Sequence, residues 1–526
     1  MSAEKKSLYS DYEEVPEKPY VVQNSKYLLW MYKLDNLGVE IRGIERVTLD
    51  ERATNSKWKL FMQVIGLWFA ACGGVTTMSS FFLPTLAYYL DMRSSLIAAL
   101  IGVNVGNLVP AYTSTMGPQS GCRQMVTARF LFGQWFVKVI AIIVIIGGIG
   151  WSVINCVAGG QLILAISNAG LEVGIVVIMI VSWIIGVFGI RVLLKFQTTL
   201  AIPTNVAILL FYIVVCKKTS HIADTNQAIG DMNMDLQTNA GHWLSVFALA
   251  YSVTSTWGLG AADYYILFPE GTPDWQVFML TFLGIAIPSN FAAVCSIIAG
   301  AITFTYHPWL TNYDAYGIGG IFALAFEPWH GFGKFVVVVL YISLMCNNIM
   351  NTYSCALEFQ LIDTRLAYVP RWVWVTVVAV IYLVLALAGK EHLNNILSNF
   401  LPMLGYWITM YITLLLEENL IFRSTQAARR LHYNEFDVEG GEKITMLYNW
   451  ANWNRPNRRS IGLAATFAFL CGVAGAVLGM NQVYYVGVLA EKIGHDGADI
   501  GMWLCIGFTG LTYPPMRYFE LKKFGR

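Results

Sequence analysis

The sequence predicts an all-α membrane protein with twelve transmembrane helices. Hydrophobic residues make up 56% of its 526 positions, and charged residues make up only 13%. Apolar runs of about 20 residues recur along the chain, and each is long enough to cross about 30 Å of hydrocarbon. The lipid bilayer is therefore the expected environment. The formal net charge of +1 gives no reason to expect a nucleic acid as partner.

The apolar runs divide the chain into spans and connecting segments. The spans are expected at about 61–90, 93–116, 127–157, 170–189, 197–216, 243–268, 275–305, 333–361, 371–389, 394–416, 460–480 and 498–518. They group into a cytoplasmic tail (1–60), helices 1 to 5 (61–216), an extracellular loop (217–242), helices 6 to 10 (243–416), a cytoplasmic loop (417–459), helices 11 and 12 (460–518) and a C-terminal tail (519–526).

The distribution of basic residues predicts the orientation. With the N-terminus inside, the cytoplasmic segments carry 27 Lys and Arg and the external segments carry six. This bias follows the positive-inside rule, so both termini are expected in the cytoplasm. The first 60 residues contain no apolar stretch typical of a cleaved signal, so the first span is expected to direct insertion.

Two spans carry clusters of small and polar residues in their middle. The first reads LWFAACGGVTTMSSFFLPTLAYYL and contains Thr76 and Thr77, and the sixth reads SVTSTWGLGAAD and contains Ser255, Trp257 and Gly258. Interrupted helices five spans apart favour two inverted repeats with a binding site at their interface. The alternative is a packing face, because small residues let membrane helices approach closely.

Three further spans carry candidate site residues. Trp151 and Asn155 in the third span are four residues apart and share one helical face, where an indole and an amide suit a small planar heterocycle. Each also has a simple packing interpretation. The eighth span places Asn347, Asn348 and Asn351 within about one turn, and the tenth contains Asn399, Pro402 and Tyr406, which suggest a bendable gate.

Four charged residues near these motifs have a structural interpretation. Asp263 and Glu358 are candidate proton-responsive carboxylates, but we expect Asp263 to cap a helix or to reach an interfacial partner, and Glu358 to lie near the cytoplasmic end. Arg123 and Arg129 are expected at the cytoplasmic interface, in contact with lipid head groups.

The sequence contains no signature of catalysis or of metal binding. It has no P-loop and no GxSxG match, its seven histidines lack metal-ligand spacing, and its nine cysteines include no C-x-x-C pair. We therefore expect no catalytic residues, no metal and no disulfide framework.

Five motifs carry a resemblance to a known family: GPQSGCRQMVTARFLFG, GWSVIN, TWGLGAADYYILFPE, NNIMNTYS and the closing RYFELKKFGR. With them the sequence resembles the purine–cytosine permease branch of the nucleobase–cation symport family, from about residue 36 to the C-terminus. This resemblance implies a leucine-transporter-like fold, with two inverted five-helix repeats and two added helices, that works by alternating access. A planar ring would lie between Trp151 and Trp257 and bond to Asn155 and the eighth-span asparagines, with Thr76 and Thr77 beside it.

The resemblance also indicates a substrate. Where fungal nucleobase permeases of this branch resemble WFSAN in the first helix, this chain reads WFAAC, in agreement with the fungal members that carry vitamin B6. It therefore implies proton-coupled import of pyridoxine and related vitamers across the plasma membrane, without a cofactor. A nucleobase permease is the alternative within the class, and a nutrient sensor without transport is the alternative outside it. The sequence does not indicate an oligomeric state.

Overall fold

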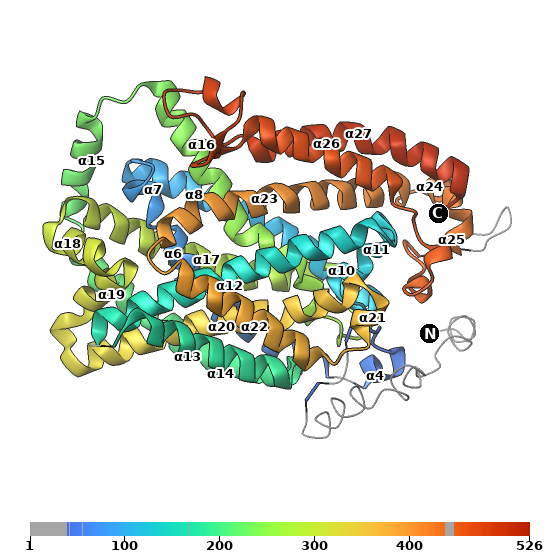
Figure 1. Ribbon diagram of the computed structural model, residues 1–526, viewed down its shortest axis with the longest axis horizontal. Helices are drawn as coiled ribbons and strands as arrows, with labels where there is room; N and C mark the ends of the chain where they lie inside the picture. Colours follow the sequence, from blue (N-terminus) through green and yellow to red (C-terminus); the bar gives the residue numbers. More distant parts are fainter. Residues whose placement is uncertain (1–38, 41–42, 55, 168, 437–445) are drawn as a thin grey trace.

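The computed structural model describes residues 39–40, 43–54, 56–167, 169–436 and 446–526. Most of the predicted N-terminal tail lies outside the described residues. The described chain is almost entirely helical, and its long helices run roughly side by side along the long axis of the molecule (Figure 1).

The helices and strands follow one another in three stretches. The first contains α4 (Leu49–Ala53), α5 (Lys57–Cys72), α6 (Val75–Ser80), α7 (Leu83–Leu86), α8 (Met92–Ser114), α9 (Met116–Ser120), α10 (Gln124–Thr127), α11 (Arg129–Phe132), α12 (Phe136–Ile166), α13 (Leu171–Phe188), α14 (Ile190–Cys216) and α15 (His221–Asp231). The second contains α16 (Leu236–Ser255), η2 (Thr256–Leu259), η3 (Ala261–Tyr264), α17 (Asp274–Thr305), α18 (His307–Tyr316), α19 (Ile318–Phe326), η4 (Glu327–Trp329), α20 (His330–Ile362), α21 (Thr364–Ala367), α22 (Arg371–Ala388) and α23 (Leu393–Glu417). The third contains η5 (Glu418–Phe422), α24 (Gln426–Arg429), η6 (Arg430–His432), α25 (Tyr433–Phe436), η7 (Trp450–Asn452), η8 (Pro456–Arg458), α26 (Leu463–Gly479), β1 (Asn481–Gln482), β2 (Tyr485–Val486), η9 (Ala490–Lys492) and α27 (Gly501–Phe524).

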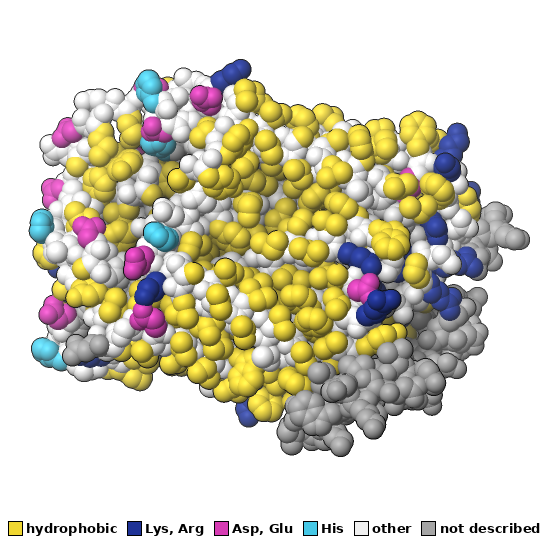
Figure 2. All heavy atoms as spheres, viewed as in Figure 1, with side chains coloured by type: hydrophobic (Ala, Val, Ile, Leu, Met, Phe, Trp, Pro, Cys, Tyr) yellow, Lys and Arg dark blue, Asp and Glu magenta, His cyan; other side chains and the backbone are white. Residues whose placement is uncertain are grey.

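Nine helical segments of the described residues are long and apolar enough to cross a membrane. Apolar side chains cover the middle of the face in Figure 2, and charged side chains gather at its two ends. Large apolar side chains are exposed along α8, α12, α13 and α14, for example Ile101, Ile146 and Ile202. Their exposure to water would be unfavourable, whereas contact with lipid suits them. The protein is therefore a multi-pass membrane protein.

Two helix boundaries differ from the sequence-based expectation. The third span was expected at 127–157, but α12 covers Phe136–Ile166, because the chain first forms the short helix α11, which ends at Gly133 with φ +67°. The fifth span was expected from residue 197, but α14 begins at Ile190, directly after Gly189 with φ +90°. In both cases a glycine in the left-handed region ends one helix, and a new helix follows.

The expected interruption in the first span occurs at Gly73 and Gly74, between α5 and α6. A Cβ atom on Gly73 would lie 2.7 Å from the carbonyl oxygen of Phe69, and one on Gly74 would lie 2.7 Å from Oγ of Ser343 in α20. The break therefore requires glycine at both positions, because the preceding turn of α5 crowds Gly73 and α20 packs directly against Gly74.

The sixth span contains both a helix-packing face and a helix break, the two alternatives that its sequence left open. Thr254 donates to the backbone oxygen of Val103 in α8 at 2.8 Å, and a Cβ atom on Gly106 of α8 would lie 2.4 Å from the oxygen of Tyr251. This part is a packing face. Directly after Ser255, the α-helix gives way to the 3₁₀ turns η2 and η3, so the expected break begins at Thr256.

The C-terminal helices α26 and α27 pack against each other and against α23 (Figure 1). A two-stranded antiparallel hairpin, β1 and β2, follows α26, with Asn481 paired to Val486 and Gln482 paired to Tyr485. This hairpin and the segment that leads to α27 lie over the ends of α16 and α23. Hydrogen bonds from this segment to α16 and α23 hold the N-terminal halves of these two helices together.

Candidate functional site

Four polar side chains from three helices form one hydrogen-bonded chain in the core. Thr76 in α6 donates from Oγ1 to Oδ1 of Asn155 in α12 at 2.6 Å. Asn155 donates from Nδ2 to Oδ1 of Asn347 in α20 at 3.0 Å, and Asn351 donates to the same oxygen at 3.0 Å. Asn155 and Asn347 are buried, whereas Asn351 is partly exposed. The chain therefore ends in an amide that a ligand can reach.

The same region satisfies the backbone of the first helix break. Nδ2 of Asn347 donates to the carbonyl oxygen of Ala71 at 3.3 Å, and Oγ1 of Thr77 donates to the carbonyl oxygen of Cys72 at 2.8 Å. Interrupted backbone at membrane depth is tolerated where protein groups or a cavity satisfy it. Asn347 thus links the broken helix to the amide chain.

An aromatic wall stands at the second helix break. Trp257 in η2 is partly exposed and meets Trp68 of α5 edge to face, with ring centroids 5.5 Å apart. Trp68 also meets Tyr264 of η3 edge to face at 5.6 Å and donates from Nε1 to the Tyr265 hydroxyl at 3.2 Å. Tyr264 and Tyr265 thus hold Trp68 in place, and Trp68 packs against one side of the Trp257 indole. Part of this indole remains exposed, as stacking would require.

Trp151 lies one turn before Asn155 on α12 and is 8% exposed. The neighbouring Gly150 is covered by Phe400 of α23, because a Cβ atom there would lie 2.0 Å from the end of the Phe400 ring. The helix that carries the predicted gate residues therefore packs directly beside Trp151.

The other predicted site residues have different surroundings. Asn348 donates from Nδ2 to the Ser182 hydroxyl of α13 at 2.9 Å, so the structure does not bring it to the amide chain. Ser255 is fully buried at the last residue of α16. Gly258 packs closely on α8, because a Cβ atom there would lie 2.6 Å from a methyl group of Val109.

The predicted gate residues connect α23 to the segment between α26 and α27. Oδ1 of Asn399 accepts from the backbone N–H of Val483 at 2.8 Å. The Tyr406 hydroxyl donates to the Asp499 carboxylate and accepts from Nε2 of Gln482 at 2.9 Å. Helix α23 continues through Pro402. A movement of this helix would have to break these bonds.

Arg123 and Arg129 are buried in protein, which corrects the expectation that they contact lipid head groups. Arg123 donates from Nη2 to the Tyr353 hydroxyl at 2.6 Å and from Nη1 to the backbone oxygen of Asp263 at 3.4 Å. The Asp263 carboxylate accepts from the backbone N–H of Gln124, the first residue of α10, at 2.7 Å. Asp263 therefore caps a helix, as its structural interpretation predicts.

Glu358 is buried on α20, and its Oε2 has no hydrogen-bond partner among the described residues. It lies seven residues beyond Asn351, which is about 10 Å along the helix axis. The charged groups that act on it are Asp263, Arg129 and Arg123. A buried carboxyl group without full hydrogen bonding is costly in free energy.

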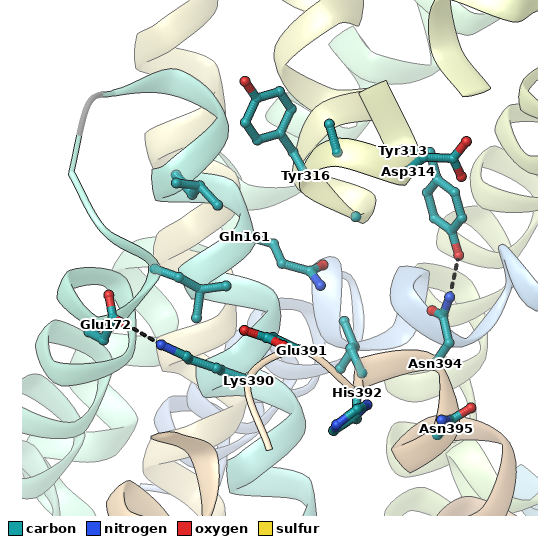
Figure 3. A pocket seen from close by; sticks show the side chains of 15 residues that line it. Gln161, Glu172, Tyr313, Asp314, Tyr316, Lys390, Glu391, His392, Asn394 and Asn395 are labelled. Carbon is teal, nitrogen blue, oxygen red and sulfur yellow. Dashed lines mark hydrogen bonds and ion pairs between the residues drawn. The ribbon is translucent and has the colours of Figure 1, made fainter. Parts of the chain in front are cut away.

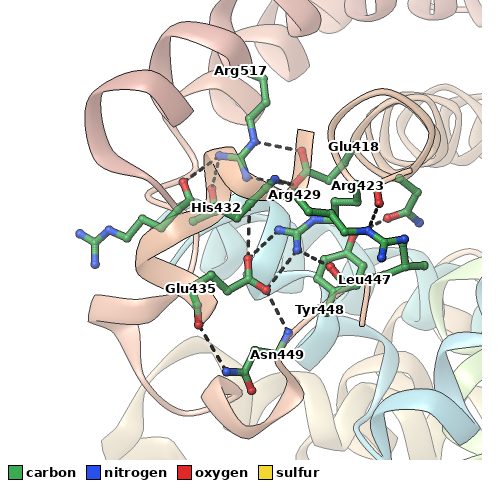
Figure 4. A network of polar contacts seen from close by, with 12 residues as sticks. Glu418, Arg423, Arg429, His432, Glu435, Leu447, Tyr448, Asn449 and Arg517 are labelled. Atoms are coloured by element: carbon green, nitrogen blue, oxygen red, sulfur yellow. Dashed lines mark hydrogen bonds and ion pairs between the residues drawn. The ribbon is translucent and has the colours of Figure 1, made fainter. Parts of the chain in front are cut away.

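A separate charged cluster ties the 417–459 loop to the helix ends (Figure 4). Arg423 donates from Nη2 to Glu435 at 2.8 Å and from Nε to Glu418 at 2.8 Å, and Arg517 of α27 donates to Glu418 at 2.9 Å. Burial alone would raise the pKa of Glu435, but the charges of Arg423 and His432 lower this pKa to about 2. Burial and Arg423 lower the pKa of the His432 imidazole. The cluster therefore holds the loop against α27.

Sequence reasoning missed several residues that build the site. Trp68 supports Trp257, Ser343 accepts from the backbone N–H of Val75 at 3.0 Å, and Asn205 of α14 donates to the carbonyl oxygen of Phe69 at 3.0 Å. A polar residue inside an apolar span is the only sequence signal for Ser343 and Asn205. Their partners lie too far along the chain for a local pattern to reveal.

A multi-pass bundle with two interrupted helices around a buried amide chain defines a secondary-transporter type of membrane protein. Residues 50–493 match the family model described as permease for cytosine/purines, uracil, thiamine and allantoin. The chain belongs to this family.

Curated relatives cover most of the chain. It is 46% identical to the vitamin B6 transporter TPN1 of Saccharomyces cerevisiae, with 94% of this chain and 90% of the relative covered. It is 29% identical to the purine-cytosine permease FCY21 of Saccharomyces cerevisiae, with 93% of this chain and 88% of the relative covered. It is 28% identical to the purine-cytosine permease fcyB of Emericella nidulans, with 97% and 95% covered. These relatives are transporters and permeases, and the protein is accordingly not an enzyme.

The fold is similar to that of Mhp1, a nucleobase-cation-symport-1 family transporter. The closed conformation of Mhp1 with bromovinylhydantoin bound matches with a TM-score of 0.61 at 14% sequence identity, over 93% of this chain and 96% of that chain. The inward-facing conformation of Mhp1 also matches with a TM-score of 0.61, at 13% identity, over 92% and 96%.

Proposed function

We propose that the protein is a proton-coupled secondary transporter that imports vitamin B6 across the plasma membrane by alternating access. The substrates are pyridoxine, pyridoxal and pyridoxamine. The observation that carries the proposal is the amide chain from Asn155 through Asn347 to Asn351, which joins the first broken helix to α12 and α20. The 46% identity to a vitamin B6 transporter supports the choice of substrate.

The pyridine ring stacks on Trp257, with Trp151 as the second wall. Trp257 offers an accessible indole face that Trp68 and Tyr264 hold in place. Asn351 is the amide that meets the substrate, because Asn155 and Asn347 are buried and already bonded to each other. An amide both donates and accepts, so it can bond a ring nitrogen and a hydroxyl group.

The chain crosses the membrane twelve times in this proposal. The segment α16 with η2 and η3, together with α26 and α27, adds three spans to the nine long apolar segments of the described residues. The interruptions in α5–α6 and in α16–η3 lie at corresponding places of two inverted five-helix repeats. Lys and Arg gather at the end of the molecule that carries α4 and the C-terminus (Figures 1 and 2), which supports a cytoplasmic location of both termini.

A proton is the coupling ion, and Glu358 is its carrier. The structure supports this assignment in two ways: the carboxyl group is buried with one oxygen unpaired among the described residues, and it lies on the helix that carries Asn347 and Asn351. Arg129, Arg123 and Asp263 are the charges around it. Protonation of Glu358 would remove one negative charge from this group of charged residues, and the neighbouring helices would respond to that change.

Alternating access would involve α23. Its bonds through Asn399 and Tyr406 to the α26–α27 segment hold its outer half in place, and Phe400 covers α12 beside Trp151. Movement of this half, with Pro402 as its flexible point, would open the path to Trp151 and Asn155.

A nucleobase permease is the second candidate. The family description and the relatives at 27–29% identity favour it. The stacking wall and the amide chain would suit a purine or a cytosine ring as well. A sensor that binds the vitamin without moving it is a third possibility, and accumulation inside cells separates it from a transporter.

Uptake of labelled pyridoxine by cells that lack their own carrier tests the proposal. We expect saturable accumulation that a protonophore abolishes and that pyridoxal and pyridoxamine inhibit. Absence of pyridoxine uptake, together with strong uptake of cytosine or adenine, would contradict the substrate assignment. Binding of pyridoxine to the purified protein without accumulation in cells would identify a sensor.

A further inference from the structure

A cavity of about 630 Å³ lies at the end of the molecule opposite to α4 and the C-terminus (Figures 1 and 3). Four elements line this solvent-open cavity: the last part of α12 at Gln161, the start of α13 at Glu172, the end of α18 at Tyr313–Gly317 and the segment 390–395 that leads into α23. It is large enough for a single-ring heterocycle with its first layer of water.

Helix α12 carries residues of both the cavity and the candidate site, and α23 begins at the cavity and packs on α12 beside Trp151. Gln161 is six residues beyond Asn155 on α12, which is about 9 Å along the helix axis. Asn395 and Phe400 are likewise on one helix, α23, and Phe400 covers α12 at Gly150. The cavity residue Gln161 is therefore about two helical turns from Asn155 along α12, on a different face of the helix.

The turn between α18 and α19 holds Gln161 in place at the floor of the cavity. Oε1 of Gln161 accepts from the backbone N–H of Ile318 at 3.2 Å. A Cβ atom on Gly317, where φ is +60°, would lie 2.4 Å from the Gln161 amide, so the turn packs directly on this side chain. In Figure 3 the amide of Gln161 lies between Tyr316 and Glu391.

The lining combines aromatic rings, amides and an excess of negative charge. It contains three carboxylates, Glu172, Asp314 and Glu391, one ammonium group, that of Lys390, and the imidazole of His392. Lys390 is paired with Glu172, whereas Asp314 and Glu391 form no ion pair within the described part of the chain. With the His392 imidazole neutral, the cavity therefore carries two uncompensated negative charges beside the Tyr313 and Tyr316 rings.

We propose that this cavity is an entry vestibule that binds the incoming heterocycle weakly and sorts it by charge, so that cationic and neutral rings enter and phosphorylated, anionic rings are repelled. The inference rests on the proposed function for its substrate class. Charges of one sign around a cavity raise the local concentration of counter-charged solutes, and salt weakens this effect. A cationic amine gains most, a neutral ring is little affected, and a phosphate ester is disfavoured.

The double variant Asp314→Asn/Glu391→Gln tests the vestibule through transport. At low ionic strength we expect its KM for pyridoxamine to rise about 2- to 5-fold, as the loss of two charges at about 8 Å in water predicts. The KM for pyridoxine should change less than 2-fold, and inhibition of pyridoxine uptake by pyridoxal phosphate should become stronger. High salt should remove the difference between variant and wild type.

The double variant Asp224→Asn/Asp231→Asn is the matched control, because it removes two carboxylates of α15 at the same end of the molecule but outside the cavity lining. Equal KM changes for both vitamers, or equal effects in the control, would overturn the proposal. Failure of the wild type to import any vitamer would instead refute the proposed function.

A chemical probe tests the vestibule without relying on transport. Cysteine at position 395 (Asn395→Cys) should react several-fold faster with a cationic methanethiosulfonate than with an anionic one of similar size. The Asp314→Asn/Glu391→Gln background should reduce this rate ratio about 2- to 5-fold, and the α15 control should leave it unchanged. An unchanged ratio in the Asp314→Asn/Glu391→Gln background would refute the charge filter, whatever the protein transports.

Discussion

Asn155 donates from Nδ2 to Oδ1 of Asn347 at 3.0 Å, across 192 residues of sequence. This bond joins α12 to α20, and the same Asn347 side chain also holds the backbone of the first broken helix through Ala71. One amide thus connects three elements of the candidate site. The arrangement explains why a buried polar group is retained at this position in an otherwise apolar core.

Asn347→Ala should therefore impair transport strongly. It leaves the amide donor of Asn155 and the oxygen of Ala71 without their partner in the buried core, and each orphaned buried group costs about 1–3 kcal/mol. We expect kcat/KM for pyridoxine to fall at least 10-fold, measured as initial uptake rates corrected for the amount of protein in the membrane.

Asn348→Ala is the matched control for Asn347→Ala. Its amide bonds to Ser182 of α13, outside the amide chain. We expect a lower thermal midpoint for this variant but a KM within 2-fold of the wild type. An equal loss of affinity in both variants would contradict the separation of the two asparagines.

Trp257→Ala should abolish most substrate binding while the protein still reaches the membrane. Stacking of a heterocycle on an aromatic side chain is worth about 1–3 kcal/mol, so the KM should rise roughly 5- to 150-fold. Trp257→Phe should retain part of the affinity, because a smaller ring still stacks. The control is Trp275→Ala, since this indole is 66% exposed on α17. Normal pyridoxine uptake by Trp257→Ala would refute the stacking role.

The helix breaks could be predicted from the sequence, because glycine, serine and threonine cluster in the middle of two spans that otherwise consist of apolar residues. The roles of Asn347 and Asn348 could not be separated in this way. Neighbouring residues on a helix point about 100° apart, so only one of the two can face α12, and the sequence does not indicate which.

Contacts between residues far apart in the sequence are the second reason why part of the site could not be predicted. Arg123 looks like an interfacial arginine, but the backbone of Asp263, 140 residues away, and the hydroxyl of Tyr353, 230 residues away, bury it. Trp68 is a similar case, since its contact with Trp257 depends on how the two broken helices meet. No local pattern contains this information, because the tertiary contacts alone determine it.

Glu358→Gln should uncouple transport from the proton gradient. The glutamine keeps the shape of the buried side chain but cannot release or take up a proton. We expect exchange of labelled for unlabelled pyridoxine to persist, while accumulation against a gradient and its stimulation by acidic external medium disappear. Glu327→Gln, which changes an exposed carboxylate, should behave like the wild type. Accumulation driven by protons in Glu358→Gln would assign coupling to another group.

Glu435 should make the stability of the charged cluster around Arg423 depend on pH. Arg423 and His432 lower its pKa to about 2 against the effect of burial, from an ordinary value of 4.5. Because its folded pKa is depressed, the unfolded chain binds more protons in acid. The stabilisation is complete above about pH 4.5 and is lost as the pH falls towards 2.

Glu435→Gln tests this dependence. The substitution leaves the buried Arg423 without its strongest partner, and breaking a buried ion pair costs about 3–5 kcal/mol. We expect a lower thermal midpoint at pH 7, measured by tryptophan fluorescence in detergent, and a smaller decrease of the midpoint between pH 5 and pH 3 than in the wild type. Glu491→Gln, an exposed carboxylate, should keep the wild-type profile. The same pH profile in Glu435→Gln and in the wild type would show that another carboxylate controls acid unfolding.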